Sequence, residues 1–185
     1  MKKLDKYVID RLSIELQVIN TTFRNNELTQ LTNFEKSIIY KYSEDGYEST
    51  NEKLRISNGK VIDEFAAYLI SVLSKLPNYK SLCYRTATLN NFDLLKYCEA
   101  YQNSTSIIEH TFLSCSKSKL LAQYFKHDSI FIIKSKNAKE IENVSKFGIN
   151  SGQNEKEVLF LANTKFNILE IICENEMTII TMEEN

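Results

Sequence analysis

The chain has 185 residues, of which 43% are apolar and 25% are charged, with a single proline. This length and composition fit one folded domain with a sizeable core, and they exclude a disordered or fibrous chain. The net charge of −1 provides no overall field toward nucleic acid or an acidic membrane surface. No apolar run approaches the length of a membrane span, and the N-terminus lacks the apolar stretch of a secretory signal, so we expect synthesis in the cytoplasm.

Residues 1–78 are expected to be mainly helical, because apolar residues recur there with the period of an amphipathic helix. Thr32 and Glu35 form a capping box, in which the threonine hydroxyl accepts an N–H and the glutamate reaches back. Asn58-Gly59 predicts a turn. The predicted helices are one over residues 4–23, one from Thr32 to a stop at 43–46, a short one over 49–55 and one over 61–73.

The periodicity changes near residue 79 and predicts a β-rich part over residues 79–185. Residues 82–88 have strand composition, and the near-continuous apolar run 129–133 is typical of a central strand. Helices first and strands later indicate an α+β fold, which we expect to be one domain. The other predicted elements are a helix capped at Asn90-Asn91 with apolar positions Leu94, Leu95, Cys98 and Tyr101, extended segments over 106–113, a helix over 117–125, and strands over 155–160, 165–173 and 177–182.

The four cysteines predict free, mostly buried thiols rather than a disulfide framework. Cys83, Cys98, Cys115 and Cys173 have no C-x-x-C spacing, and three of them lie within apolar runs. The two histidines lie apart from any cluster with metal-ligand spacing, so we expect no metal site.

Two acids, Glu155 and Glu157, follow a glycine-containing loop and precede an apolar run. Residues two apart in an extended strand point to the same side, so both carboxylates would face one cleft while Val158 and Phe160 anchor the opposite face. The spacing alone favours a solvated strand edge, because two acids in this pattern occur by chance in many chains. Other residues that lie near the two acids must therefore decide whether the acids form a solvated strand edge or a functional site.

Arg85 is one of only four arginines and lies mid-strand among apolar neighbours. A buried guanidinium without a partner is costly, and its planar fork suits a carboxylate or a phosphate; a structural ion pair with a core glutamate is the alternative. Ser114 and Ser116 lie between an apolar strand end and the next predicted helix. Ser116 is expected to cap that helix, although a hydroxyl at a strand end can equally orient a carboxylate.

The order of arginine strand, serine motif and E-x-E strand resembles the bacterial toxin-type mono-ADP-ribosyltransferases of the arginine–serine–glutamate class. The resemblance runs from about Leu31 onward and includes the helical opening at 31–55. Residues 112–116, Phe-Leu-Ser-Cys-Ser, are similar to the aromatic–x–Ser-Thr-Ser element of that family. The literal Ser-Thr-Ser at 104–106 lacks the preceding aromatic strand end, so Ser114 is the better match.

The resemblance implies a helical N-terminal part packed on a split, mixed or antiparallel sheet that binds NAD as a substrate, without a metal. It implies transfer of ADP-ribose to a protein arginine, with nicotinamide released. Arg85 would bind the NAD diphosphate, Ser114 would hold Glu157 against the ribose, and Glu155 would activate the nucleophile. In the family, a glutamate at the position of Glu155 accompanies arginine targets. The implied NAD-contacting set is Arg85, Thr86, Ser114, Ser116 and Glu157.

Three positions depart from the family pattern. Thr86 stands where a glycine usually follows the arginine. A second arginine after the serine motif is missing, so Lys117, Lys119 or Lys126 would have to replace it at the diphosphate. The loop before the acids lacks the usual target-contacting aromatic near Gly152.

Several functions therefore stay open. The first is an arginine-directed transferase acting as a toxin, effector or phage-type modifier, and the second is an NAD glycohydrolase with water as acceptor. Transfer to a non-arginine or nucleic-acid acceptor is a third, which the near-neutral charge does not favour. A degenerate NAD-binding module, for which Thr86 and the missing arginine argue, is the fourth. The resemblance implies a target protein and no membrane partner, and it leaves open an immunity or regulatory protein and delivery into another cell.

Overall fold

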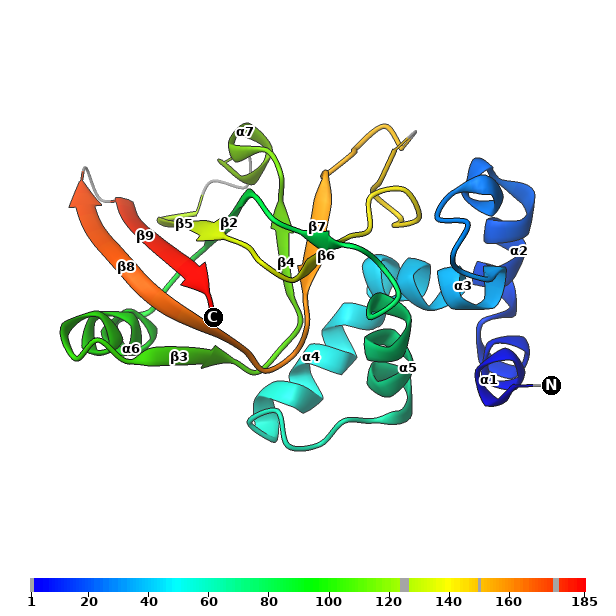
Figure 1. The fold of residues 1–185 in the computed structure, drawn as a ribbon, viewed down its shortest axis with the longest axis horizontal. Helices are drawn as coiled ribbons and strands as arrows, with labels where there is room; N and C mark the ends of the chain where they lie inside the picture. The colour runs from blue at the N-terminus through cyan, green and yellow to red at the C-terminus, as the bar shows by residue number, and fades with distance from the viewer. Residues whose placement is uncertain (1, 124–126, 150, 175–176) are drawn as a thin grey trace. The chain divides into compact units, whose positions relative to one another are not determined.

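The computed structural model describes residues 2–123, 127–149, 151–174 and 177–185 (Figure 1). The chain divides into two compact units, which we call the helical unit (Met1–Pro77 with Lys139–Glu157) and the sheet unit (Asn78–Ala138 with Val158–Asn185). The predicted change from helical to β-rich character near residue 78 coincides with this division. The structure adds that the segment 139–157, which carries both acids, belongs to the helical unit. Each unit is described by itself.

The helical unit begins with two helices where one was predicted. Leu12 has φ −129° and ψ 34°, which ends α1 and starts α2. Both helices pack against α3, and the break lets Val8 and Ile19 be buried together with Glu15, whose carboxylate pairs with Lys41 at 3.1 Å. The helices of this unit are α1 (Lys3–Arg11), α2 (Ser13–Thr21), η1 (Phe23–Asn26), α3 (Asn33–Lys41), η2 (Tyr42–Gly46), α4 (Tyr47–Ile56) and α5 (Glu64–Leu73).

The predicted capping box is confirmed, but the predicted stop at 43–46 is wrong. The Glu35 N–H donates to Thr32 Oγ1 at 3.3 Å, and the Thr32 N–H donates to Glu35 Oε2 at 2.9 Å. At its other end α3 continues through a π-helical turn into α4. A Cβ on Gly46 would lie 3.0 Å from the Lys41 carbonyl oxygen, so glycine permits the wide turn to close without a stop.

The turn at Asn58-Gly59 is confirmed, with φ values of 49° and 69°. The helix predicted from residue 61 begins at Glu64 instead. Asp63 caps it by accepting the Ala66 N–H at 2.9 Å, and Val61 before the cap is 59% exposed. The start of α5 is therefore set by the Asp63 cap, and the apolar residues before it, Val61 and Ile62, are not part of the helix.

The sheet unit carries a mixed sheet with the strand order β1-β6-β7-β4-β2-β5-β9-β8-β3. β5 is paired on one side with β2 (antiparallel) and on the other with β9 (parallel), which confirms the predicted central strand. Figure 1 shows β8 and β9 running side by side to the C-terminus. The α+β class is therefore confirmed. The strands are β1 (Asn78–Tyr79), β2 (Leu82–Ala87), β3 (Ser106–Glu109), β4 (Leu113–Ser116), β5 (Ser129–Lys134), β6 (Ala138–Glu140), β7 (Glu157–Phe160), β8 (Thr164–Glu174) and β9 (Met177–Glu184).

Two helices, α6 (Asn91–Gln102) and α7 (Lys119–Gln123), belong to the sheet unit. The Asn90 cap of α6 is confirmed, since Asn90 Oδ1 accepts the Asp93 N–H at 2.9 Å. The predicted apolar face of α6 is partly wrong: Leu94 packs against the core, but Leu95 and Tyr101 are exposed. Tyr97 is buried instead, against the ring of Phe131, with the ring centroids 5.3 Å apart. The predicted helix over 117–125 is represented by α7, and residues 124 and 125 of that prediction lie outside the described part of the chain.

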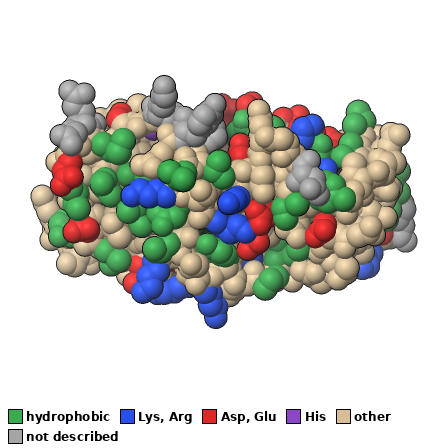
Figure 2. Space-filling view, turned by 90° about the horizontal axis from the view of Figure 1, so that it is seen from above, with side chains coloured by type: hydrophobic (Ala, Val, Ile, Leu, Met, Phe, Trp, Pro, Cys, Tyr) green, Lys and Arg blue, Asp and Glu red, His purple; other side chains and the backbone are tan. Residues whose placement is uncertain are grey.

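The state of the cysteines and the charge distribution on the surface agree with what the sequence predicts. Cys83 and Cys115 are buried, Cys98 is half-buried and Cys173 is exposed, and all four are free, as predicted. On the face drawn in Figure 2, basic and acidic side chains are interspersed with hydrophobic ones, in keeping with the net charge of −1. No helix within the described ranges has the length and apolar character needed to cross a membrane.

Candidate active site

Arg85 lies in the middle of β2, opposite Phe131 of β5. It is half-buried, and its Nη1 donates to the carbonyl oxygen of Ser114 at 2.8 Å. The pairing of Tyr84 with Ser116 brings β2 and β4 together at this point. Strand pairing thus joins two of the predicted residues, Arg85 and Ser114. Within the described part of the sheet unit, Arg85 makes no ion pair with a glutamate, so the alternative of a structural ion pair inside that unit is not found.

The hydroxyls beside these residues connect the two strands to α7. Thr86 Oγ1 donates to the Ala122 carbonyl oxygen at 2.7 Å. Ser116 Oγ accepts the Ser118 N–H at 3.1 Å, in the turn directly before α7, and the capping role expected of it stays a prediction. Thr86 therefore fastens α7 to the arginine strand. The NAD contacts expected of Thr86 and Ser116 stay predictions.

The literal Ser-Thr-Ser triplet at 104–106 lies elsewhere in the sheet. Ser106 begins β3, the edge strand beside β8, and its Oγ donates to Asn167 Oδ1 at 2.7 Å. β4, which carries Ser114, is the neighbour of the arginine strand. The choice of Ser114 as the motif serine is therefore supported by the strand order.

The two acids lie at the end of the helical unit. Glu157 is only 6% exposed, begins β7, and accepts the Ile141 N–H on its carbonyl oxygen at 3.1 Å. Glu155 is half-buried, and its N–H donates to the Phe147 carbonyl oxygen at 2.9 Å. Burial raises the pKa of the Glu155 carboxyl above its ordinary value.

The strand predicted over 155–160 begins only at Glu157. Lys156 has φ 51°, in the left-handed region, and its N–H donates to Asn154 Oδ1 at 2.9 Å. A non-glycine residue there is disfavoured by about 1–2 kcal/mol, which the Asn154 turn helps to offset. Simple alternation does not hold between Glu155 and Glu157, so the reason given for their facing one side was wrong. Beyond Glu157 the strand is fully enclosed, with Val158, Leu159 and Phe160 all at 0% exposure.

Arg24, which the sequence analysis passed over, holds the segment that leads to the acids. Its side chain is buried, and its Nε and Nη2 donate to the carbonyl oxygens of Val144 at 3.2 Å, Ser145 at 3.0 Å and Lys146 at 3.4 Å. The guanidinium carbon also lies 5.2 Å from the ring centroid of Tyr40. Burial lowers the pKa of Arg24 from its ordinary value. All of these oxygens are backbone groups, so the Arg24 guanidinium fixes the path of the backbone at residues 144–146.

Three more side chains hold the same segment. Asn143 donates to Glu27 at 2.7 Å, Lys146 pairs with Glu44 at 2.8 Å, and the Lys139 ammonium donates to the Leu76 carbonyl oxygen at 2.9 Å. The segment from β6 to β7 therefore depends on the N-terminal helices for its shape. The scarcity of arginine, together with Phe23 next to Arg24, was the sequence signal that could have revealed this role.

An aromatic side chain approaches Glu155 from another element. Tyr47, at the start of α4, is 43% exposed. Its pKa is raised by partial burial first, then by Glu48, with a smaller contribution from Glu155. Gly152, where the family loop carries an aromatic, has open space around it. Tyr47 is therefore an aromatic within electrostatic range of Glu155 that the motif did not predict.

The strand order relates the three motifs. β7, β4 and β2 are consecutive strands of the sheet, and their residues Val158–Phe160, Leu113–Ser116 and Leu82–Ala87 all belong to the sheet unit. Glu157 is the residue directly before Val158. The motif strands are therefore neighbours, although they are far apart in the sequence.

The same arrangement of helices and strands occurs in solved structures. The chain is similar to the ADP-ribosyltransferase HopU1 of Pseudomonas syringae, with a TM-score of 0.78 and 16% identity over 92% of this chain and 85% of that one. It is similar to Exoenzyme S from Pseudomonas aeruginosa, with a TM-score of 0.76 and 15% identity over 98% and 86% of the two chains. For the Vis toxin, an ADP-ribosyltransferase from Vibrio splendidus, the TM-score is 0.65 and the identity 21%, over 100% and 87%.

The chain has the ADP-ribosyltransferase fold.

A curated relative agrees with this fold. The chain is 28% identical, over 159 residues, to the NAD(+)–protein-arginine ADP-ribosyltransferase Tre1 of Serratia proteamaculans (strain 568). The match covers 84% of this chain and 33% of Tre1, so the chain spans about one third of the length of that relative. No protein-family model matches the chain. The resemblance drawn from the motifs is confirmed by these two comparisons.

Within the ADP-ribosyltransferase fold, the lysines expected to replace the second arginine differ in setting. Lys117 is half-buried directly after β4, and Lys119 is exposed at the start of α7. Lys126 lies outside the described residues. Lys117 and Lys119 both follow the serine motif closely, and their contact to a diphosphate stays a prediction.

Proposed function

We propose that this chain is an NAD-dependent mono-ADP-ribosyltransferase that modifies an arginine of a target protein and releases nicotinamide. The observation that carries the proposal is the succession β7-β4-β2, in which the strands of the acid, serine and arginine motifs are neighbours. The hydrogen bond from Arg85 to the Ser114 carbonyl supports it, because it links two of the motifs directly. The name of the curated relative, a protein-arginine ADP-ribosyltransferase, supports the choice of substrate.

In the proposed reaction, Arg85 holds the NAD diphosphate through charge-assisted hydrogen bonds, and Thr86 and Ser116 line the same side. Ser114 fixes the rotamer of Glu157, which accepts a hydrogen bond from the 2′-hydroxyl of the nicotinamide ribose. Breaking the bond between C1 of that ribose and nicotinamide produces an oxocarbenium-like centre, as in glycoside hydrolysis. The Glu157 carboxylate stabilises this charge more in the transition state than in bound NAD.

Glu155 is the proposed activator of the acceptor. A guanidinium is cationic and a poor nucleophile, so a carboxylate must both position it and take its proton. The new bond joins a guanidine nitrogen to C1 of the ribose, the proton passes to Glu155, and nicotinamide leaves as a neutral base. The raised pKa of Glu155 favours its acting as a base, because a more basic carboxylate accepts a proton more readily. A solved complex of Vis with agmatine, a guanidine compound, supports a cationic acceptor.

The proposal includes a setting and a partner. Vis is described as a toxin, and a further fold relative, XopAI from Xanthomonas axonopodis, as a type III effector. We therefore propose that this chain acts on the protein of a competitor or host. Exoenzyme S was solved in complex with the human 14-3-3 protein beta, which supports a regulatory or immunity protein as a second kind of partner.

The test uses labelled NAD with a cell lysate, and it measures both label transfer and nicotinamide release. Glu157→Gln should reduce both by about a thousandfold, because the transition-state charge loses its carboxylate. Glu155→Ala should lose transfer while part of the NAD hydrolysis remains. Glu170→Gln, at an exposed position of β8, is the control and should match the unchanged protein. Full transfer by the Glu157 variant would reject the assignment, and nicotinamide release without transfer in the unchanged protein would favour a glycohydrolase.

A further inference from the structure

A hollow lies in the sheet unit, and none of the residues assigned to NAD lines it. It has a volume of about 620 Å³ and is formed by two segments, the turn from β1 into β2 and the end of β5 with the turn that follows it. Its lining residues are Asn78, Lys80, Ser81, Leu82, Lys134, Ser135, Lys136 and Asn137. Arg85, Ser114 and Glu157 are not among them, so its role is separate from the proposed transferase chemistry.

The walls of this pocket are fixed by hydrogen bonds between the two segments. Asn78 Nδ2 donates to Asn137 Oδ1 at 3.0 Å, and Ser135 Oγ donates to the Tyr79 carbonyl oxygen at 2.8 Å. The Ser135 N–H donates to the Ser81 carbonyl oxygen at 3.1 Å. The pocket is therefore preformed, which lowers the ordering cost for a ligand that binds there.

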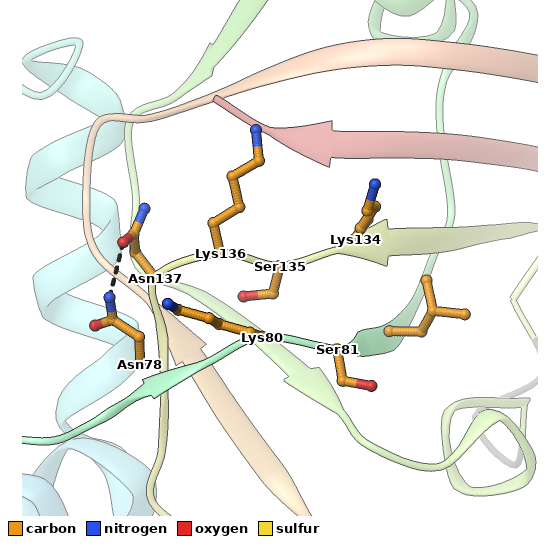
Figure 3. A pocket seen from close by; sticks show the side chains of 8 residues that line it. Asn78, Lys80, Ser81, Lys134, Ser135, Lys136 and Asn137 are labelled. Carbon is orange, nitrogen blue, oxygen red and sulfur yellow. Dashed lines mark hydrogen bonds between the residues drawn. The ribbon is translucent and has the colours of Figure 1, made fainter.

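Three ammonium groups surround the pocket, and few carboxylates oppose them. Figure 3 shows Lys80 extending toward the Asn78–Asn137 pair, while Lys134 and Lys136 rise from the other segment. Glu183 faces Lys134 at 3.2 Å and Lys136 at 3.5 Å, so one carboxylate is shared by two lysines. Lys80 has no ion-pair partner within the described ranges.

A second acid nearby, Glu184, is buried and binds the backbone of the pocket. Its Oε2 accepts the backbone N–H groups of Lys136 at 2.6 Å and Asn137 at 2.7 Å, and its side chain is only 5% exposed. These bonds shape the turn between β5 and β6. Three lysine ammonium groups at the pocket therefore stand against two carboxylates, of which only that of Glu183 is partly exposed.

We propose that this pocket binds a small compound that carries a diphosphate or longer polyphosphate group. Lysine ammonium groups bind phosphate oxygens as point charges, and three of them on two walls match an anion with several charged oxygens. The Ser81 hydroxyl adds a neutral donor, and the exposed side chain of Leu82 offers an apolar surface for a sugar or base. A volume of about 620 Å³ is that of a small-molecule site, and the near-neutral chain provides no extended basic surface for a nucleic acid.

The test measures binding of inorganic pyrophosphate and of ADP to the full chain by calorimetry at constant ionic strength. Saturable binding is expected below about 1 mM for both probes. In Lys80→Gln/Lys136→Gln the dissociation constant of pyrophosphate should rise at least about tenfold, because two charge-assisted contacts are lost. Lys165→Gln, an exposed lysine of β8, is the matched control and should stay within about twofold.

Arg85→Gln separates this pocket from the proposed NAD site. It should impair NAD cleavage while the pyrophosphate binding that Lys80→Gln/Lys136→Gln weakens is retained. In amide spectra, pyrophosphate should shift the signals of Ser81 and Asn137, which locates the site without any substitution. Binding that survives the double lysine change, binding that is lost only with Arg85→Gln, or tighter binding of a single-stranded oligonucleotide than of pyrophosphate would each overturn the proposal.

Discussion

The two units hold the residues predicted for the site by different means. In the sheet unit, Arg85 and Ser114 lie on paired strands, so backbone hydrogen bonds of the sheet fix their separation. In the helical unit, Glu155 and Glu157 follow a segment with little regular structure, which is held by side chains that reach its backbone carbonyls. A strand position tolerates changes in neighbouring side chains, whereas a loop held in this way depends on each of them. Substitutions should therefore affect the acid segment more than the arginine and serine strands.

The largest effect should come from Gly148→Ala. An added Cβ would lie 1.7 Å from the Glu142 carbonyl oxygen, so the backbone of the acid segment would have to move. We expect a loss of roughly 3 kcal/mol in the free energy of unfolding, together with loss of transfer. Denaturant titration measures the first quantity. Gly152→Ala is a matched control from the same loop, because nothing lies within 4 Å of its Cβ position. Equal losses of unfolding free energy in both variants would show that the close contact at Gly148 does not constrain the loop more than the open space at Gly152 does.

Arg24→Gln should have the next largest effect. It leaves up to three buried carbonyl oxygens without their donor, and we expect a loss of about 2 kcal/mol in the free energy of unfolding. The Michaelis constant for the target should rise more than that for NAD, since the displaced loop carries Glu155. Arg55→Gln, at an exposed position of α4, should change neither quantity. A stable Arg24 variant with unchanged constants would show that the loop keeps its path without this anchor.

Tyr97→Phe tests the sheet unit at a comparable buried polar contact. The Tyr97 hydroxyl donates to Glu109 at 2.8 Å, while Glu109 keeps Lys96 at 3.4 Å as a second partner. Because the ring and the strand pairing remain, we expect a loss of only about 1 kcal/mol and little change in NAD binding. Tyr101→Phe, exposed on the same helix, is the control for denaturant titration. A loss larger than that of Arg24→Gln would reverse the comparison.

The smallest expected effect is on the pH dependence of stability, where a carboxylate in each unit should change the free energy of unfolding with opposite sign. Burial raises the pKa of Glu155, so the ionised carboxylate is less favourable in the folded than in the unfolded chain. Near about pH 3 both states are protonated, and the penalty appears as pH rises through the ordinary range of a glutamate. Glu155→Gln should therefore stabilise the protein at about pH 7.5 and make no difference at about pH 3.

Glu183, in the sheet unit, provides the opposite case. The hydrogen bond from Lys134, and then the charges of Lys134 and Lys136, lower its pKa. Its stabilising contribution is present above the ordinary pKa and is lost as pH falls through the folded value. Glu183→Gln should destabilise the protein at about pH 7.5 and have no effect at low pH. Urea midpoints measured across pH should separate the two variants, and effects of the same sign would contradict the assigned causes.

Local chemistry made part of the fold predictable. The capping box of Thr32 and Glu35 and the turn at Asn58-Gly59 depend on neighbouring residues alone, and both were found. The break at Leu12 and the inward face of α6 depend on what the helices pack against, so the apolar pattern gave the wrong answer. Tyr97 illustrates the reason, since a partner 12 residues away, Glu109, makes an inward polar tip acceptable.

The candidate site was predictable to the extent that it consists of short motifs. Arg85 was predicted in the middle of a strand and Ser114 at a strand end, and the structure places them on β2 and β4, which are neighbours. The left-handed Lys156 was missed, since the E-x-E pattern suggested an uninterrupted strand and the Asn154 turn was not considered. The role of Arg24 could not be predicted, because its partner Val144 lies 120 residues further along the chain. A pattern within one segment carries no information about such a contact.

The dependence of the acid segment on Arg24 limits how this protein can be trimmed. A fragment that starts at Asn78 contains all the strands from β1 to β9. It would nevertheless lack Arg24, Glu27 and Glu44, and the stretch before Glu155 would be left with uncapped carbonyls and no defined course. To make a smaller version of this protein, other donors to these backbone carbonyls would have to be introduced before any helix is removed.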